Sequence, residues 1–412
     1  MDKPTQSSMY NYTRSVQRKI PLMEDDELKR ESELLRQMHP LLISFLFTGL
    51  DFRPQCAHGC HTNVKYLETG IKIYLTIINI ISWIYALVAI YGIIATEDSM
   101  PTKQCIANGF VEILTIFLRC VLYWRRKEIL NNFKYLSYDY DKIKHKSKYL
   151  NKGVISVLVV ILPGVHILSY GFVVLYYISK DQIFPMYFIR GKYGNIIPVT
   201  LPPYIYYLLV IIDILLFSIH YMSTCLFVIL MLIACTTLSL ILQDYRKSIN
   251  FSGATFEVLQ KRHIAEMNTV KRVDKCLSFP LFILLGFHIT ILFFCVVFFH
   301  SIPHTERDWL HSPSEMDLYF CGVFILFSTQ YFVITTFAAR VDEEVQNIKM
   351  EVAKMDGLPS RLSVAEQILL IAKVNSYSNI CLTLWGFLNI TKSFVFSSFG
   401  ALLTFGALFK DL

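Results

Sequence analysis

Several ionisable side chains interrupt long apolar stretches of the sequence. Asp213 directly follows "LLVII", His166 and His288 lie in two other apolar stretches, and Glu112 and His220 also fall within such runs. A charged group at the centre of a bilayer costs roughly 2.5–3.5 kcal/mol on insertion scales, so each of these groups needs a compensating contact. Two explanations stay open for each residue: a hydrogen bond inside a helix bundle, or a contact to a polar ligand.

Aromatic and amide side chains fall at similar depth in the same apolar stretches. A cavity with aromatic walls and a few convergent polar groups is typical of a small-ligand site. Aromatic faces stack on sugar rings or on apolar compounds, and Asp213 could pair with a protonated amine or a hydroxyl. We therefore predict a ligand pocket built from His166, Tyr170, Phe172, Tyr206, Tyr207, Asp213, His288, Phe293, Phe324, Phe327 and Gln330.

The composition predicts that membrane-spanning helices position these side chains. Hydrophobic residues make up 54% of the 412 residues, charged residues 17%, and the mean hydropathy is +0.45. Soluble domains have about 25% charged residues. Apolar segments of about 20 residues can cross a bilayer. We predict such spans at 73–95, 104–124, 154–178, 204–243, 276–300, 317–339 and 390–409, with a shorter interfacial or re-entrant helix near 39–52.

The distribution of Lys and Arg predicts the orientation of these spans. Segments 1–72, 125–152, 244–275 and 340–373 together carry 31 Lys and Arg residues, whereas the alternate connections 96–103, 179–203 and 301–316 carry 5. Because basic residues accumulate on the cytosolic side, the N-terminus is expected in the cytosol and the C-terminus outside. The fold class is therefore an all-α membrane protein with seven transmembrane helices in this orientation.

The segments on the cytosolic side favour helices that extend the bundle. The 204–243 stretch has no Pro, Gly or polar turn at which it could reverse, so one long helix is predicted there. Ser363 and Glu366 form a capping box ahead of an apolar-periodic run. We divide the chain into a cytosolic segment (1–72), a six-helix ligand-binding bundle (73–339), cytosolic anchor helices (340–389) and a last helix (390–412).

The last helix is rich in small residues, among them Ser393, Ser397, Gly400 and Ala407. Such residues let neighbouring helices approach closely. One explanation is a packed helix inside a single bundle that ends in the interfacial charges Lys410 and Asp411. The other is a pore-lining helix contributed by several subunits, whose acidic ends form a ring that attracts cations.

The topology and the end of the sequence resemble the arthropod seven-transmembrane chemoreceptors, and within them the gustatory receptors. That branch closes its last helix with Thr-Tyr, five mostly apolar residues and Gln-Phe. Here Thr404 matches, Phe405 is a conservative replacement for Tyr, and Asp411 and Leu412 depart from Gln and Phe at the same spacing. The topological resemblance covers the whole chain, and the resemblance in sequence covers the part from Leu382 onward.

The resemblance implies a ligand-gated, nonselective cation channel in the plasma membrane of a sensory neuron. It implies four subunits, identical or related, that are joined through cytosolic helices around a pore lined by the last helix. The gate positions fall on Asp411 and Leu412, near Thr404 and Phe405, and we add Leu408 as a second apolar layer. The expected partners are a small-molecule tastant and membrane lipid. An odorant-receptor-type subunit is the alternative.

Other classes of membrane protein fit the sequence less well. A G-protein-coupled receptor needs the opposite distribution of Lys and Arg. A transporter lacks support because no internal repeat is visible. We expect no enzyme activity and no cofactor. "CAHGCH" (56–61) has no second ligand pair, so no metal site is predicted. The net charge of +7 is explained by the cytosolic Lys and Arg residues, so no nucleic-acid partner is expected.

Overall fold

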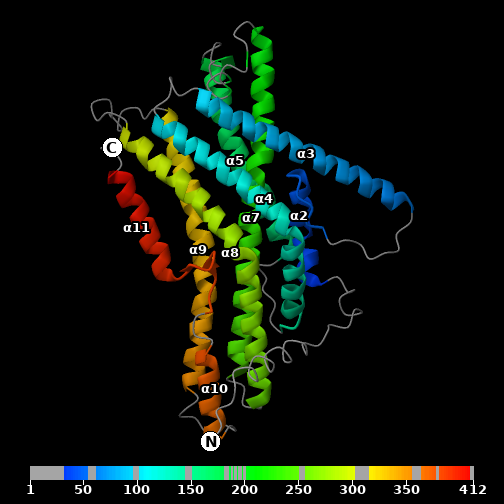
Figure 1. Cartoon of the computed structure of the whole chain (residues 1–412), viewed down its shortest axis with the longest axis vertical. Helices are drawn as coiled ribbons and strands as arrows, with labels where there is room; N and C mark the ends of the chain where they lie inside the picture. Colours follow the sequence, from blue (N-terminus) through cyan, green and yellow to red (C-terminus); the bar gives the residue numbers. More distant parts are fainter. Residues whose placement is uncertain are drawn as a thin grey trace, which may run out of the picture.

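A computed structural model describes the chain over residues 32–53, 62–95, 102–143, 151–180, 201–249, 256–301, 315–354, 363–376 and 380–408, with a few further positions between 185 and 197. The described part consists of long helices and one small hairpin (Figure 1). The helices are α2 (Glu33–Phe47), α3 (Thr62–Ala95), α4 (Thr102–Asp141), α5 (Lys152–Lys180), α7 (Pro203–Ile249), α8 (Phe256–Ser301), α9 (Glu315–Lys354), α10 (Val364–Ser376) and α11 (Lys392–Leu408).

Five of these helices contain segments that are long and apolar enough to cross a membrane. The segments are Glu68–Gly92, Lys152–Tyr176, Pro203–Ile249, Phe256–Val297 and Phe320–Lys354. The two other predicted spans lie on α4, which carries Glu112 and Arg119 within its apolar part, and on α11, which has 17 residues. The predicted spans therefore lie on helices of the structure, except that 390–409 begins two residues before α11 and ends one residue beyond the described part.

Helix α7 is the central element of the bundle. It runs without interruption from Pro203 to Ile249, so the prediction of one long helix over 204–243 is confirmed. The apolar side chains of its second half are buried almost all round, from Leu226 to Leu242. Such a pattern is typical of a helix at the centre of a bundle. In Figure 1, α7, α8 and α9 continue together below the level of α3 and form a narrow bundle with α10.

The capping box predicted ahead of α10 is confirmed. Ser363 Oγ accepts a hydrogen bond from Glu366 N at 3.3 Å, and Glu366 Oε2 accepts one from Ser363 N at 2.8 Å. These bonds satisfy two amide groups that the first turn leaves without intrahelical partners. The bond from the Ser363 backbone, together with that from its hydroxyl, lowers the pKa of the Glu366 carboxyl because it stabilises the charged form.

A β-hairpin between α10 and α11 is a feature that the sequence did not predict. Strands β1 (Thr383–Leu384) and β2 (Leu388–Asn389) pair antiparallel. The turn needs two residues with positive φ, Trp385 (51°) and Gly386 (76°). Gly adopts this conformation freely, whereas a bulky residue does so only when its surroundings hold it there. The hairpin lies within the 340–389 segment that we had assigned to anchor helices.

The helix predicted near 39–52 is α2, and it begins earlier than predicted. Ser32 caps it, and Leu34, Met38, Leu41 and Phe45 are fully buried in the main core. The helix packs against α4, α5 and α7. Its apolar side chains therefore face protein to a larger extent than the sequence suggested.

The end of α2 provides a test of the packing around a buried arginine. Gly49 has φ +82°, its carbonyl accepts from Asn79 Nδ2 at 2.8 Å, and Arg119 Nη2 donates to the preceding Thr48 carbonyl at 2.6 Å. A Cβ at position 49 would lie 3.0 Å from Asn79 Oδ1. We expect Gly49→Ala to lower the free energy of unfolding by at least about 1–2 kcal/mol, the cost of the left-handed conformation.

The matched control for this prediction is Gly70→Ala in α3, where a Cβ would meet no atom within 4 Å. There the gain in helix propensity is expected to stabilise the protein by up to about 1 kcal/mol. Thermal unfolding of both purified variants in detergent measures the difference. An unchanged melting temperature for Gly49→Ala would contradict the packing described at this turn.

Candidate functional site

One face of α7 carries the polar and aromatic side chains that organise the outer part of the bundle. Tyr206, Asp213, Phe217, His220 and Tyr221 follow one another at spacings of seven, four, three and one. Residues at such spacings lie along one side of an α-helix. Tyr206, Asp213 and His220 are each at most 3% exposed, so this side faces the interior of the protein.

Asp213 forms the first of two polar centres in the bundle, near the N-terminal end of α7. It is 1% exposed, and Tyr170 Oη of α5 donates a hydrogen bond to its Oδ2 at 2.7 Å. Tyr193 Oη donates to the other carboxylate oxygen, Oδ1. Tyr193 belongs to the segment between α5 and α7, so Asp213 ties this connection to the helix bundle. Tyr193 was absent from the predicted site.

Aromatic contacts run along this face of α7, from the Tyr170 ring beside Asp213 toward the C-terminal end of the helix. The Tyr170 ring stacks on Phe217 with centroids 3.9 Å apart and planes at 19°, and Phe217 lies 4.3 Å from Tyr221. Tyr221 Oη donates to Glu112 Oε1 of α4 at 3.0 Å, and His220 Nε2 lies 3.1 Å from Glu112 Oε2. Glu112 of α4 is therefore bound by two neighbouring side chains of α7.

A second polar centre links α5, α8 and α9. The side-chain amide of Gln330 lies 2.8 Å from His166 Nε2 and 3.1 Å from His288 Nε2, while His288 Nδ1 donates to the Leu284 carbonyl at 2.8 Å. As placed, Gln330 Oε1 faces His288 and Gln330 Nε2 faces His166. Because a neutral His288 that donates at Nδ1 can only accept at Nε2, we assign the amide in the flipped orientation, with its N–H donating to His288 and its oxygen accepting from His166. One glutamine thus fixes the tautomers of two histidines.

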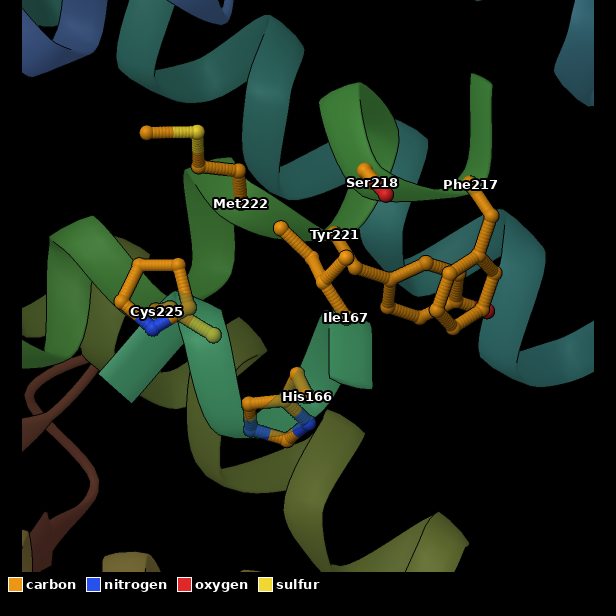
Figure 2. Close-up of a pocket in the computed structure, with 8 residues that line it drawn as sticks. His166, Ile167, Phe217, Ser218, Tyr221, Met222 and Cys225 are labelled. Atoms are coloured by element: carbon orange, nitrogen blue, oxygen red, sulfur yellow. The ribbon is translucent and has the colours of Figure 1, made fainter. Parts of the chain in front are cut away.

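A small cavity lies between these two polar centres. Its walls are formed by Pro163, His166, Ile167, Phe217, Ser218, Tyr221, Met222 and Cys225, which come from α5 and α7 (Figure 2). The cavity volume is about 10 Å³, which is room for about one water molecule. Ligand pockets usually have about 300–1,000 Å³. A ligand of this size can enter here only if side chains of the cavity wall move aside.

The structure brings part of the predicted pocket together. His166, Tyr170, Asp213, His288, Phe327 and Gln330 belong to the two polar centres or contact them, with the Phe327 ring 5.0 Å from His166. Tyr206 is buried in an upper cluster with Tyr85 and Tyr193, and Phe293 and Phe324 pack at the edge of the main core. Tyr207 is half-buried, and Phe172 is 70% exposed on the outer surface of α5.

The predicted pore residues lie at the end of α11. Thr404 is exposed, and its hydroxyl donates to the Gly400 carbonyl at 2.9 Å. Phe405 and Leu408 lie on the last turns of the helix, and Asp411 and Leu412 fall outside the described residues. The structure therefore gives the path of the helix that carries the motif and leaves the gate itself a prediction.

Over the residues whose side chains the structure describes, 392–404, helix α11 packs through one side. Val395 and Leu402 are buried against α8 and α9, Ser398 hydrogen-bonds to Tyr331, and the Phe399 and Phe332 rings lie 4.6 Å apart. In Figure 1 the helix stands to one side of the bundle. Its opposite side is exposed and carries a row of small and polar residues, Ser393, Ser397, Gly400 and Thr404. Phe396 (75% exposed) and Leu403 (42% exposed) flank this row.

The glutamine between the two histidines provides a test of the second polar centre. Gln330→Leu leaves one imidazole nitrogen of the buried His288 and one of the half-buried His166 without hydrogen bonds, and a buried group of this kind costs about 1–3 kcal/mol. We expect a lower melting temperature for the purified variant. Thr329→Leu, on the exposed side of the same helix, is the matched control and is expected to change little. Equal melting temperatures for the two variants would show that the contacts of Gln330 contribute nothing to stability.

Among the residues that the structure describes, no group of three or more His, Cys, Asp or Glu side chains could hold a metal ion. The contacts of the site are hydrogen bonds, aromatic stacking and apolar packing. These interactions suit a small organic ligand.

Taken together, the helices define an all-α membrane protein with a polar and aromatic centre in its outer part. No protein-family model matches the sequence, and no curated protein is significantly similar to it. The fold is similar to that of the insect olfactory receptor OR5 from Machilis hrabei in complex with eugenol, with a TM-score of 0.61 and 14% identity over 91% of this chain and 97% of that chain. A second structure of OR5 gives a TM-score of 0.59 and 13% identity over 91% and 98%. The chain therefore has the fold of the insect olfactory receptors.

Proposed function

We propose that the chain is a chemoreceptor subunit that acts as a ligand-gated, nonselective cation channel. The observation that carries this proposal is the one-sided packing of α11. An exposed row of small and polar side chains on an otherwise apolar helix suits the close approach of neighbouring copies of that helix around a water-filled path. Several copies of α11 around a common axis would enclose such a path, with Asp411 and Leu412 at its outer end.

The structural similarity supports the proposal at the level of the fold, because OR5 is an olfactory receptor and one of its structures holds eugenol. In this chain the ligand would enter the small cavity beside Phe217, Tyr221 and Met222, between the two polar centres. Assembly as four subunits, identical or related, is part of the same proposal.

Within this class we propose a gustatory-type receptor, on the basis of the Thr404-Phe405 motif and its spacing to Asp411 and Leu412. The odorant type is the second candidate, and the fold shared with OR5 favours it. A panel of water-soluble tastants and volatile odorants, read by calcium influx in cells that express only this chain, separates the two types.

Patch-clamp recording on the same cells tests the channel mechanism. A response carried by the chain itself is expected to continue when the pipette solution contains no GTP or ATP and a G-protein inhibitor is added. Ligand-evoked currents that disappear under these conditions would favour a receptor that signals through another protein and would contradict the proposal.

A further inference from the structure

The hairpin ahead of α11 presents large apolar side chains on the surface of the chain. Trp385 is 51% exposed, Phe387 73% and Leu388 52%. The Trp385 and Phe387 rings lie 5.2 Å apart, and Leu388 follows them in the sequence, so the turn carries an apolar tip. The backbone of this turn is strained at Trp385. An exposed group of this kind is typical of a contact with a membrane or with another protein.

The contacts of the hairpin place it at one defined level of α8. The Thr383 backbone N–H and hydroxyl both donate to Asp274 Oδ1, at 2.6 and 3.0 Å, and Trp385 N donates to the Ser278 carbonyl at 3.3 Å. The Trp385 ring lies 5.0 Å from Phe279 and 5.6 Å from Phe282. The polar base of the hairpin therefore lies beside Asp274, and its aromatic tip lies further along α8.

This level is the cytosolic end of the predicted membrane span. Lys275 is exposed and marks the end of the basic part of α8, and the apolar span begins with the next residue. The hairpin thus crosses the boundary between the two parts of α8. Its base is on the side of the basic residues and its tip is on the side of the apolar residues.

A second tryptophan lies at the same level on α4. Trp124 is 76% exposed and is followed by Arg125, Arg126 and Lys127. Arg125 Nη1 donates to the Lys275 and Cys276 carbonyls, at 3.2 Å each, and its guanidinium lies 5.9 Å from the centre of the Phe279 ring on which Trp385 packs. Tryptophan side chains are enriched where a membrane meets water.

We propose that the hairpin binds phospholipids of the cytosolic leaflet, with Trp385 and Phe387 inserted at the level of the headgroups, and that anionic headgroups are preferred. The exposed side chains of Lys127 and Lys275 supply the positive charge for this preference. A second copy of the chain is the alternative occupant. Because the chain has a net charge of +7, charge complementarity favours the anionic lipid.

This inference goes beyond channel activity and does not depend on it. Asn389 ends the hairpin and α11 begins at Lys392, so a lipid-bound hairpin would hold the inner end of the last helix at the depth of the headgroups. The composition of the cytosolic leaflet would then act on the position of α11.

Depth-dependent fluorescence quenching tests the inference on the full-length chain. The sequence has 4 Trp residues, so a variant with Trp83, Trp124 and Trp309 changed to Phe reports on Trp385 alone. The matched reference keeps only Trp83, which lies 46% exposed within the predicted first span. Both proteins are reconstituted into phosphatidylcholine vesicles with bromine either near the headgroup or near the end of the acyl chain.

We expect Trp385 to lose more fluorescence with the shallow bromine and Trp83 to lose more with the deep bromine. With brominated phosphatidylserine in place of phosphatidylcholine, quenching of Trp385 should increase, and Lys275→Gln should reduce that increase. Absence of quenching at Trp385 would overturn the proposal and indicate that another copy of the chain covers the hairpin. Equal quenching by the two lipids would overturn the preference for anionic headgroups.

If the triple replacement prevents folding, the difference between the wild-type protein and Trp385→Phe gives the same readout. The fluorescence that this single replacement removes is the contribution of Trp385. Shallow bromine must quench this contribution, and a contribution that is not quenched would again overturn the proposal.

Discussion

Met222→Trp is expected to abolish the ligand-evoked response of the chain. Met222 lines the small cavity together with Phe217, Tyr221 and Cys225, and the cavity volume is only about 10 Å³. Met is flexible and can move aside for a ligand, whereas an indole ring occupies the space permanently. Overpacking costs about 1–3 kcal/mol, so the variant should still fold.

Concentration–response curves for current, measured at matched surface expression, test this prediction. Met222→Leu conserves the side-chain volume and is expected to retain the response. Met222→Ala should admit larger ligands. A Met222→Trp variant with an unchanged half-maximal concentration would show that the ligand binds elsewhere in the protein.

Asp274→Ala is expected to reduce the maximal ligand-evoked current about tenfold, through loss of the link between α8 and the hairpin that precedes α11. The Asp274 carboxylate accepts from the Thr383 backbone N–H at 2.6 Å and from the Thr383 hydroxyl at 3.0 Å with either oxygen. A hydrogen bond to a charged group contributes about 1.5–3 kcal/mol. Each 1.4 kcal/mol is about a factor of ten in an equilibrium. A bond that is made in the open channel and broken in the closed one therefore accounts for this effect, whereas a bond made equally in both states would not.

The matched control is Glu343→Ala, which removes the exposed ion pair of Glu343 with Lys392 at the start of the same helix, 2.9 Å apart. Exposed ion pairs contribute only about 0–1 kcal/mol, so little change in current is expected. Thr383→Val combined with Asp274→Ala should add little to the single replacement, because both remove the same contact. Additive effects of the two replacements would contradict a shared role.

The sequence carries a strong signal for the long helices and a weak one for the hairpin. The apolar run of 204–243 is continuous and has no breaker, and α7 follows it as one helix. Each strand of the hairpin has two residues, too few for a periodic pattern. The positive φ of Trp385 depends on its packing against Phe279 and Phe282, which only the folded chain provides.

The candidate site shows the same contrast between local and long-range signals. Asp213, His166 and His288 could be selected because a polar residue in an apolar run is conspicuous. Tyr193 lies between α5 and α7, where a tyrosine is unremarkable, and its contact with Asp213 is visible only in the structure. The exposed position of Phe172 could not be predicted either, because an apolar membrane helix carries aromatic residues on its lipid side as well.

The most direct test of the channel proposal is thiol modification on the exposed side of α11 during a ligand-evoked current. Ser397→Cys places a thiol on this side, and Ile325→Cys places one on α9, where the side chain is 64% exposed and should face lipid. A charged methanethiosulfonate reagent reacts with thiols in water. If α11 lines the pore, the reagent blocks the current of Ser397→Cys and leaves those of Ile325→Cys and of the wild type unchanged. A current of Ser397→Cys that the reagent does not alter, although the ligand opens the channel, would contradict the account.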